Sequence, residues 1–284
     1  MSIEFLKLHG TEIPEICILD IGAMLIGQEP KEYSVLVEAG IAKVIGFEPV
    51  QSECDRLNME YTDKRAQYLP YFIGDGTRQT FRLNNFSMTS SLYEPNTPLL
   101  SLFNNLSELT TTVNREDVQT TCLDDIKEIN FPVDYIKIDI QGAELQAFCG
   151  GKRLLADTVV IQTEVEWVPL YQRQPLFSEI EQELRQQGFL MHRILGFGTR
   201  AFKPLVFNND VNTGSQQLWS DVVFVRDFTR LDLLSERQLL SYIVTMYEIY
   251  KAFDITAHLF DELGKRRGKE LKESYIKWLV SANK

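Results

Sequence analysis

The chain has 284 residues, of which 44% are hydrophobic and 24% charged, a composition typical of one folded domain with room for an appendage. Its 29 basic and 40 acidic residues give a net charge of −11, which argues against nucleic acid as a partner because phosphate binding requires a basic face. The sequence shows no signal-peptide pattern, no apolar run of about 18 residues and no C-x-x-C pair, so we expect a cytoplasmic protein without a membrane span.

The first part of the chain alternates short apolar runs with helical patterns. The expected strands are residues 15–21, 42–47 and 67–73, and the expected helices are residues 30–40 and 52–61. Pro30 suits the first turn of the first helix, and Gly40 suits its end. Short apolar strands joined by helices predict a parallel sheet that is covered on both faces.

The stretch from residue 80 to 119 is less regular. We expect a strand at 79–83 and then a long loop with a short helix near 100–109. Long loops in compact domains are often lids or binding loops, and disorder is the alternative interpretation.

Alternation returns in the second half. The expected strands are residues 133–140, 158–163, 189–195 and 218–226, and the expected helices are residues 143–155 and 176–187. Two final strands joined by a loop suit an antiparallel pair at the end of the sheet. The sequence therefore predicts a doubly wound α/β fold with a seven-stranded, mostly parallel sheet.

The tail changes character after residue 230. Ser235 and Gln238 form a capping-box signal, and apolar residues then recur at helical spacing. We therefore divide the chain into a domain of residues 1–230 and a helical extension of residues 231–284. The extension could pack on its own domain, which is the default, form a homodimer face, or cap a substrate pocket.

Acidic residues close most of the expected parallel strands, where ligands bind in open α/β sheets. These positions are Asp20 and Gly22, Glu48, Asp75, Asp139, and Glu164 with Glu166. Gly22 would let the backbone approach a ligand, Glu48 could accept both hydroxyls of a ribose, and Asp75 could accept from an adenine amino group. The alternative is that these acidic residues are there only because helix N-termini favour negative charge. That explanation is reasonable for any single strand-end acid but weaker for all of them together.

The glycine pattern separates two kinds of nucleotide site. Gly22 and Gly27 do not complete G-x-G-x-x-G, and Gln28 rules out a P-loop. A nicotinamide enzyme is therefore disfavoured. S-adenosylmethionine carries no phosphate, and its sulfonium cation suits an acidic site.

These residues resemble the FkbM-type methyltransferases. The resemblance spans about residues 16–228 and lies in ILDIGA (18–23), VIGFEP (44–49), IGDG (73–76), TSSLYEPN (89–96), CLDDI (122–126), YIKIDIQGAEL (135–145), TEVEWVPLYQRQPLFSEI (163–180) and SDVVFVRDF (220–228). It implies a class I methyltransferase fold, S-adenosylmethionine bound by Asp20, Gly22, Glu48 and Asp75, and Asp139 near the methyl group. Members of the family methylate hydroxyls of polyketides or sugars, which implies an O-methyltransferase acting on a small-molecule, polyketide or sugar hydroxyl. The apolar loop 24–28 departs from the usual turn, and it supports the alternative of a non-catalytic binding or scaffold protein on a degenerate methyltransferase fold.

Methyl transfer to a hydroxyl needs a base within hydrogen-bond reach of the acceptor. The candidates are Asp139, Glu144, Glu164, Glu166 and His192. We favour Asp139 and Glu164, since both lie at strand ends, whereas His192 lies inside a strand. Ser90, Ser91, Glu144 and Glu166 are the expected substrate contacts. Trp167 and Tyr171 could stack on a sugar, with core packing as the alternative. The spacing does not require a metal, so none is predicted.

Overall fold

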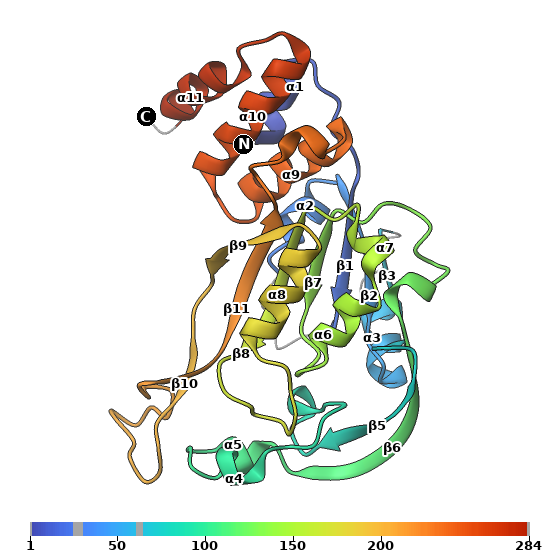
Figure 1. Ribbon diagram of the computed structural model, residues 1–284, viewed down its shortest axis with the longest axis vertical. Coiled ribbons are helices and arrows are strands. Elements are labelled where there is room, and N and C mark those ends of the chain that lie inside the picture. Colours follow the sequence, from blue (N-terminus) through green and yellow to red (C-terminus); the bar gives the residue numbers. More distant parts are fainter. Residues whose placement is uncertain (1, 25–30, 61–64, 283–284) are drawn as a thin grey trace.

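An eight-stranded sheet forms the centre of the protein in the computed structural model, which describes residues 2–24, 31–60 and 65–282 (Figure 1). Its strand order is β10-β11-β8-β7-β1-β2-β3, and β9 also pairs with β11. The parallel strands are β1 (Ile16–Ile21), β2 (Ala42–Phe47), β3 (Ala66–Leu69), β7 (Tyr135–Ile138) and β8 (Val160–Glu166). The strand β11 (Gln216–Arg226) runs antiparallel to β8, β9 (Phe189–Ile194) and β10 (Gly198–Arg200). The predicted doubly wound sheet is confirmed, with the short strand β10 in addition to the seven expected.

Both faces of the sheet are buried, which explains the nearly continuous apolar runs of the parallel strands. Leu19, Ile136 and Ile161 belong to the core on one face, beneath the helices α6 (Glu144–Cys149), α7 (Lys152–Leu155) and α8 (Phe177–Gln186). On the other face, α2 (Ser34–Glu38) packs beside β2, and α3 (Gln51–Glu60) packs beside β3. The expected helix at 143–155 is thus two short helices, α6 and α7, separated at Gly150 and Gly151.

A second, three-stranded sheet includes both ends of the stretch 80–119, where we expected a strand at 79–83 and then a long loop. The expected strand at 67–73 divides, because β3 ends at Leu69 while β4 (Phe72–Ile73) pairs with β6 (Thr112–Thr121). The strand β5 (Arg78–Asn84) runs antiparallel to β6, and between them lie η1 (Ser87–Thr89), α4 (Thr97–Leu100) and α5 (Leu106–Leu109). The expected strand at 79–83 and the expected helix near 100–109 are confirmed by β5 and by α4 and α5. The loop prediction was wrong for the residues of β6, because most of β6 is exposed and polar and its backbone pairing leaves no apolar alternation in the sequence.

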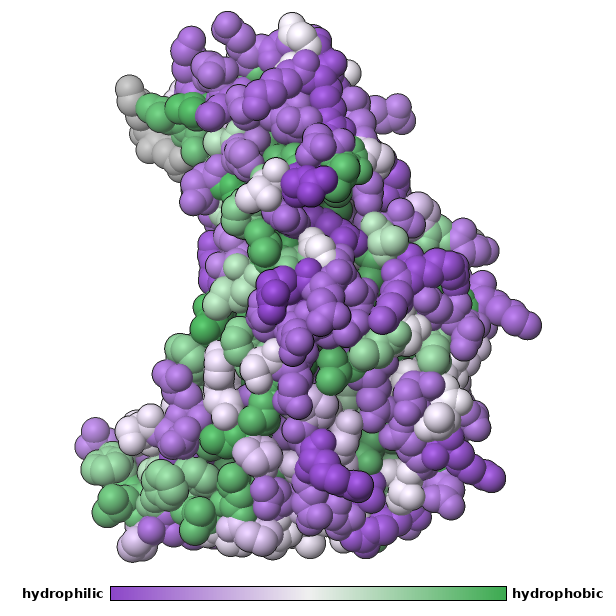
Figure 2. Space-filling view, viewed as in Figure 1, coloured by the Kyte–Doolittle hydropathy of each residue, from purple (hydrophilic) through white to green (hydrophobic). Residues whose placement is uncertain are grey.

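Exposed apolar side chains gather around β10. They are Leu102, Phe202, Leu205, Val206 and Phe207, and Figure 2 shows hydrophobic surface at the lower left, where Figure 1 places β10, α4 and α5. This surface lies toward the same end of the molecule as the carboxyl ends of the parallel strands.

The tail helices lie at the opposite end, near the amino ends of the parallel strands (Figure 1). They are α9 (Glu236–Glu248), α10 (Phe253–Arg267) and α11 (Leu271–Ala282), and they share a core with α1 (Ser2–Leu8), Ile16 and Ile18. The extension therefore packs on its own domain and does not cap the carboxyl ends. A domain boundary at residue 230 and a homodimer through these helices stay predictions. None of the helices in the described ranges is long and apolar enough to cross a membrane.

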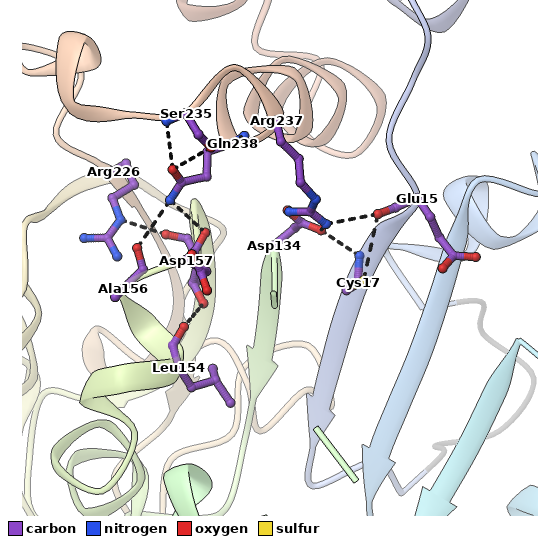
Figure 3. A network of polar contacts seen from close by, with 11 residues as sticks. Glu15, Cys17, Asp134, Leu154, Ala156, Asp157, Arg226, Ser235, Arg237 and Gln238 are labelled. Carbon is purple, nitrogen blue, oxygen red and sulfur yellow. Dashed lines mark hydrogen bonds and ion pairs between the residues drawn. The ribbon is translucent and has the colours of Figure 1, made fainter. Parts of the chain in front are cut away.

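An ion pair between the half-buried Arg237 on α9 and the buried Asp134, which precedes β7, joins the extension to the sheet (Figure 3). The Arg237 guanidinium donates to both carboxylate oxygens of Asp134, at 2.7 and 2.9 Å. Asp134 is fully buried and also accepts from the backbone N–H of Cys17 at 2.8 Å. The Asp134 carboxylate, which is shielded from water, therefore links the C-terminal extension to the sheet.

Replacing Arg237 with Ala should lower the free energy of unfolding by about 3 kcal/mol, because the Asp134 carboxylate would stay buried without its countercharge. Urea denaturation measures the change. Adding Asp134→Asn should recover part of the loss. Arg230→Ala is the control, since Arg230 and Asp232 form an exposed pair at 4.0 Å, and it should cost under about 0.5 kcal/mol. Equal losses for Arg230 and Arg237 would contradict a structural role for the pair of Arg237 and Asp134.

Candidate functional site

A cavity lies at the carboxyl ends of β1, β2 and β7, between the main sheet and the second sheet. Its apolar wall includes Phe47, Phe72, Ile73, Phe81, Leu83 and Met88. Its polar wall includes Glu48, Ser90, Lys137, Asp139 and Gln141. An apolar pocket with a few convergent polar groups is the usual form of a small-molecule site.

Gly22 allows the ends of β1 and β7 to meet at this cavity. Its φ is +80°, and a Cβ atom built on it would lie 1.9 Å from the backbone oxygen of Asp139. A side chain at position 22 would therefore push Asp139 away from its present place in the cavity wall.

Glu48 presents a nearly buried carboxyl group to the cavity. Only 3% of the residue is exposed, and its Oε1 accepts from the backbone N–H of Val50 at 2.9 Å. Burial raises the pKa of Glu48 to about 7, and the Val50 hydrogen bond offsets this only in part. The group can therefore change charge near neutral pH.

Asp20 and Asp75 do not line the cavity. Asp20 is buried, and its Oδ2 accepts from the Tyr33 hydroxyl at 2.6 Å and pairs with Lys31. Its Oδ1 has no hydrogen-bond partner within the described part of the chain. Asp75 is exposed, and its Oδ1 accepts from the backbone N–H of Thr77 at 2.9 Å and from Gln79 at 2.8 Å. The cofactor-binding roles of all four residues stay predictions, and of the four only Gly22 and Glu48 line the cavity.

The two favoured bases are joined by one side-chain amide. Gln141 Nε2 donates to Asp139 Oδ1 and to Glu164 Oε2, both at 2.8 Å. Asp139 Oδ2 also lies 3.8 Å from the Lys137 ammonium. Burial, and then the charge of Asp139, raises the pKa of Glu164 well above its usual range. The two carboxyl groups are thus close together but in unlike surroundings.

The expected substrate contacts divide into two groups. Ser90 lines the cavity, and Ser91 lies behind it, donating to the backbone oxygen of Gln141 at 2.6 Å. Glu144 and Glu166 are buried away from the cavity, and each has one oxygen without a partner among the residues described. Burial raises the pKa of Glu144 to about 7 and that of Glu166 well above its usual range.

The remaining candidates lie outside the cavity wall. His192 lies on β9, and burial lowers its pKa. Trp167 donates to the Ser220 hydroxyl at 2.8 Å and packs on Phe177, and Tyr171 is buried, so the core-packing interpretation fits both.

Of the unusual loop, Met24 lines the cavity, while residues 25–28 and Pro30 lie outside the described residues. In the described ranges, no group of three or more His, Cys, Asp and Glu side chains is arranged to hold a metal ion.

Lys137 and Gln141 line the cavity but were not among the residues predicted from the sequence. Lys137 interrupts the apolar strand 135–138 two residues before Asp139, so both side chains point to the same face of the sheet. A charged residue inside an otherwise buried strand was the signal that could have identified it.

Residues 20–191 match the methyltransferase FkbM domain. The crystal structure of methyltransferase FkbM from Methylobacillus flagellatus KT is 18% identical, with a TM-score of 0.40, over 75% of this chain and 43% of that one. Magnesium protoporphyrin IX methyltransferase (ChlM) from Synechocystis PCC 6803, crystallised with bound SAM, is 10% identical, with a TM-score of 0.38, over 79% of this chain and 76% of that one. No match was found among curated proteins. Since the family match covers more than half of its length, this chain belongs to the FkbM methyltransferase domain family and has the class I methyltransferase fold.

Proposed function

We propose that the protein transfers the methyl group of S-adenosylmethionine to a hydroxyl oxygen of a small-molecule, polyketide or sugar acceptor. The observation that carries this proposal is the position of Asp139. Its carboxylate lies in the cavity wall, at the carboxyl end of β7, between the Lys137 ammonium and the Gln141 amide.

The residues of the cavity fit an adenosyl sulfonium compound. Phe47, Phe72 and Ile73 offer apolar surface to an adenine ring, and the Glu48 carboxylate can accept from ribose hydroxyls. Acidic groups also favour a sulfonium cation. The buried Oδ1 of Asp20, which has no hydrogen-bond partner among the described residues, is a further acceptor two residues before Gly22. When bound, S-adenosylmethionine supplies an electrophilic methyl group on a positively charged sulfur.

Asp139 is the proposed general base, which accepts the proton of the acceptor hydroxyl. Burial opposes the charge on Lys137, but the carboxylates around it, Asp139 first, raise its pKa, so a positively charged ammonium lies beside the Asp139 carboxyl group. Glu164 is the weaker candidate, since burial and the charge of Asp139 raise its pKa and so disfavour the ionised form that a base needs. The two carboxyl groups thus lie in different surroundings, an ammonium beside Asp139 and closer burial around Glu164, which suits different roles.

Two measurements test the proposal. Calorimetry should show that S-adenosylhomocysteine binds. Incubation with tritiated S-adenosylmethionine and a panel of glycosides and phenols should transfer label to a hydroxyl compound in an alkali-stable form, as an ether is. Label that enters only amines or thiols would overturn the O-directed assignment. Absence of S-adenosylhomocysteine binding would favour the non-catalytic alternative.

The affinity for S-adenosylhomocysteine should depend on pH through Glu48. The pKa of about 7 leaves this group mostly neutral at pH 6 and mostly ionised at pH 8. Because the ionised form is the better acceptor for ribose hydroxyls, affinity should rise about tenfold over this range. The charged and titratable groups around it are Glu53, Lys31 and Asp20.

Glu48→Gln is the matched control and should remove most of this pH dependence. Glu48→Ala should weaken binding by roughly ten- to a hundredfold at pH 8, the value of a charge-assisted hydrogen bond. Calorimetry at both pH values measures these constants. An affinity that Glu48→Ala leaves unchanged would remove Glu48 from the ribose site.

A further inference from the structure

Gln141 occupies an unusual backbone position next to Asp139. Its φ is +52°, in the left-handed region, and Gly142 follows with a φ of +102°. A residue other than glycine rarely adopts this conformation unless its surroundings hold it there, and such positions gather at functional sites. The contacts of Gln141 are therefore informative.

Every polar group of Gln141 beyond its backbone N–H has a partner. Its backbone oxygen accepts from the Ser91 hydroxyl at 2.6 Å. Its Oε1 lies 3.1 Å from the Tyr171 hydroxyl, whose single hydrogen it shares with the backbone oxygen of Thr89, 2.8 Å away. Its Nε2 has two hydrogens, which point to Asp139 and Glu164. The amide cannot be reversed without placing its oxygen between two carboxyl groups, so these contacts fix its orientation.

We propose that Gln141 is a positioning residue whose carboxamide holds Asp139 in the cavity wall and prevents Asp139 and Glu164 from sharing one proton. The inference rests on the proposed role of Asp139 as the base. Two carboxyl groups on either side of one nitrogen repel each other when both are ionised. Without a donor between them, they would capture a proton and bond to each other, and Asp139 would no longer be free to accept the proton of the substrate.

The surroundings of the pair make the donor necessary. The titratable groups that face it come from β7, β8, β11, α6 and the segment after β8, and are Lys137, Glu166, Asp221, Glu144 and Tyr171. Carboxyl groups outnumber the single ammonium in this set. The Gln141 amide donates to both members of the pair, whereas Lys137 approaches only Asp139.

Two variants separate this role from a purely structural one. Gln141→Met keeps the approximate shape without the donor, and Gln141→Glu adds a third carboxyl group that donates only when protonated. Gln146→Met is the matched control, because the Gln146 amide bonds to two neutral groups, the Gln79 amide and the Tyr93 hydroxyl, at 2.7 and 2.9 Å.

The primary measurement is the melting temperature of each variant relative to the natural protein between pH 5.5 and 8.5, which needs neither cofactor nor acceptor. We expect the melting temperatures of both Gln141 variants to fall further below that of the natural protein as pH rises. This difference should grow by at least about 4 °C across the range, and it should grow most for Gln141→Glu. Gln146→Met should show a constant difference. Adding Asp139→Asn to Gln141→Met should remove most of the pH dependence. A pH-independent difference for the Gln141 variants would overturn the proposal.

Turnover gives the second test, with the best acceptor from the panel of glycosides and phenols. Gln141→Met should reduce turnover at least tenfold while S-adenosylhomocysteine affinity stays within about threefold, and the activity of Gln141→Glu relative to the natural protein should fall as pH rises. Equal turnover for Gln141→Met and the natural protein would contradict the positioning role. Failure of the natural protein to bind S-adenosylhomocysteine would instead refute the proposed function. The melting temperatures would then still test whether Gln141 separates the two carboxyl groups.

Discussion

Asp139→Asn should reduce turnover by about a hundred- to ten-thousandfold, the usual contribution of a general base. Asparagine has nearly the same shape and still accepts a hydrogen bond from Gln141, so the cavity should keep its form. Affinity for S-adenosylhomocysteine should therefore stay within a few-fold. The release of S-adenosylhomocysteine with the acceptor that the natural protein methylates fastest measures turnover, and calorimetry measures affinity.

The control for this variant is Asp117→Asn, the same chemical change at an exposed position of β6, where the carboxylate contacts Thr80. It should leave both quantities unchanged. Glu164→Asn would alter length as well as charge, so Glu164→Gln is the fairer test of the second carboxyl group, and its effect on turnover should be smaller than that of Asp139→Asn. Undiminished turnover in Asp139→Asn would remove Asp139 from the reaction.

The parallel strands could be predicted because burial on both faces leaves a strong apolar signal. The strands β1, β2, β7 and β8 are almost wholly buried, and the sequence runs 15–21, 42–47, 133–140 and 158–163 located each of them. The strand β6 could not be predicted in this way. Its stability comes from backbone pairing with β5, and its exposed polar side chains leave no pattern that differs from a loop.

The candidate site was predictable where topology alone determines position. Strand-end residues Glu48 and Asp139 lie together because carboxyl ends of parallel strands meet at one edge of the sheet. Asp75 follows β4, which belongs to the second sheet and pairs with β6. The Asp75 carboxylate therefore lies outside the cavity wall. That departure depends on β6, the element that the sequence did not reveal.

The role of Gln141 could not be predicted for a related reason. Its contacts come from Asp139 beside it, from Glu164 on another strand, and from Ser91 and Tyr171 in separate connections. Sequence spacing contains no information about which way its amide points. The left-handed backbone conformation of Gln141, directly before Gly142, can be recognised only in the structure.

Gly22→Ala should be the most damaging substitution at the cavity. The new Cβ atom would lie 1.9 Å from the Asp139 oxygen, and the φ of +80° would strain any side chain. Left-handed strain costs about 1–2 kcal/mol and overpacking about 1–3 kcal/mol, so the free energy of unfolding should fall by roughly 2–5 kcal/mol. Urea denaturation measures this loss. Since relief of the clash requires the ends of β1 and β7 to separate, affinity for S-adenosylhomocysteine should also fall at least tenfold by calorimetry.

Gly10→Ala isolates the strain from the clash. Gly10 has a similar φ of +66°, but nothing lies within 4 Å of the position that its Cβ would take. This variant should lose only the conformational part, about 1–2 kcal/mol, and bind S-adenosylhomocysteine as the natural protein does. The opposite outcome is that Gly22→Ala loses no more stability than Gly10→Ala and keeps its affinity for S-adenosylhomocysteine. The close contact between β1 and β7 would then not determine the shape of the cavity. The difference between the two variants is therefore a direct measure of how strongly the site depends on a glycine at the end of β1.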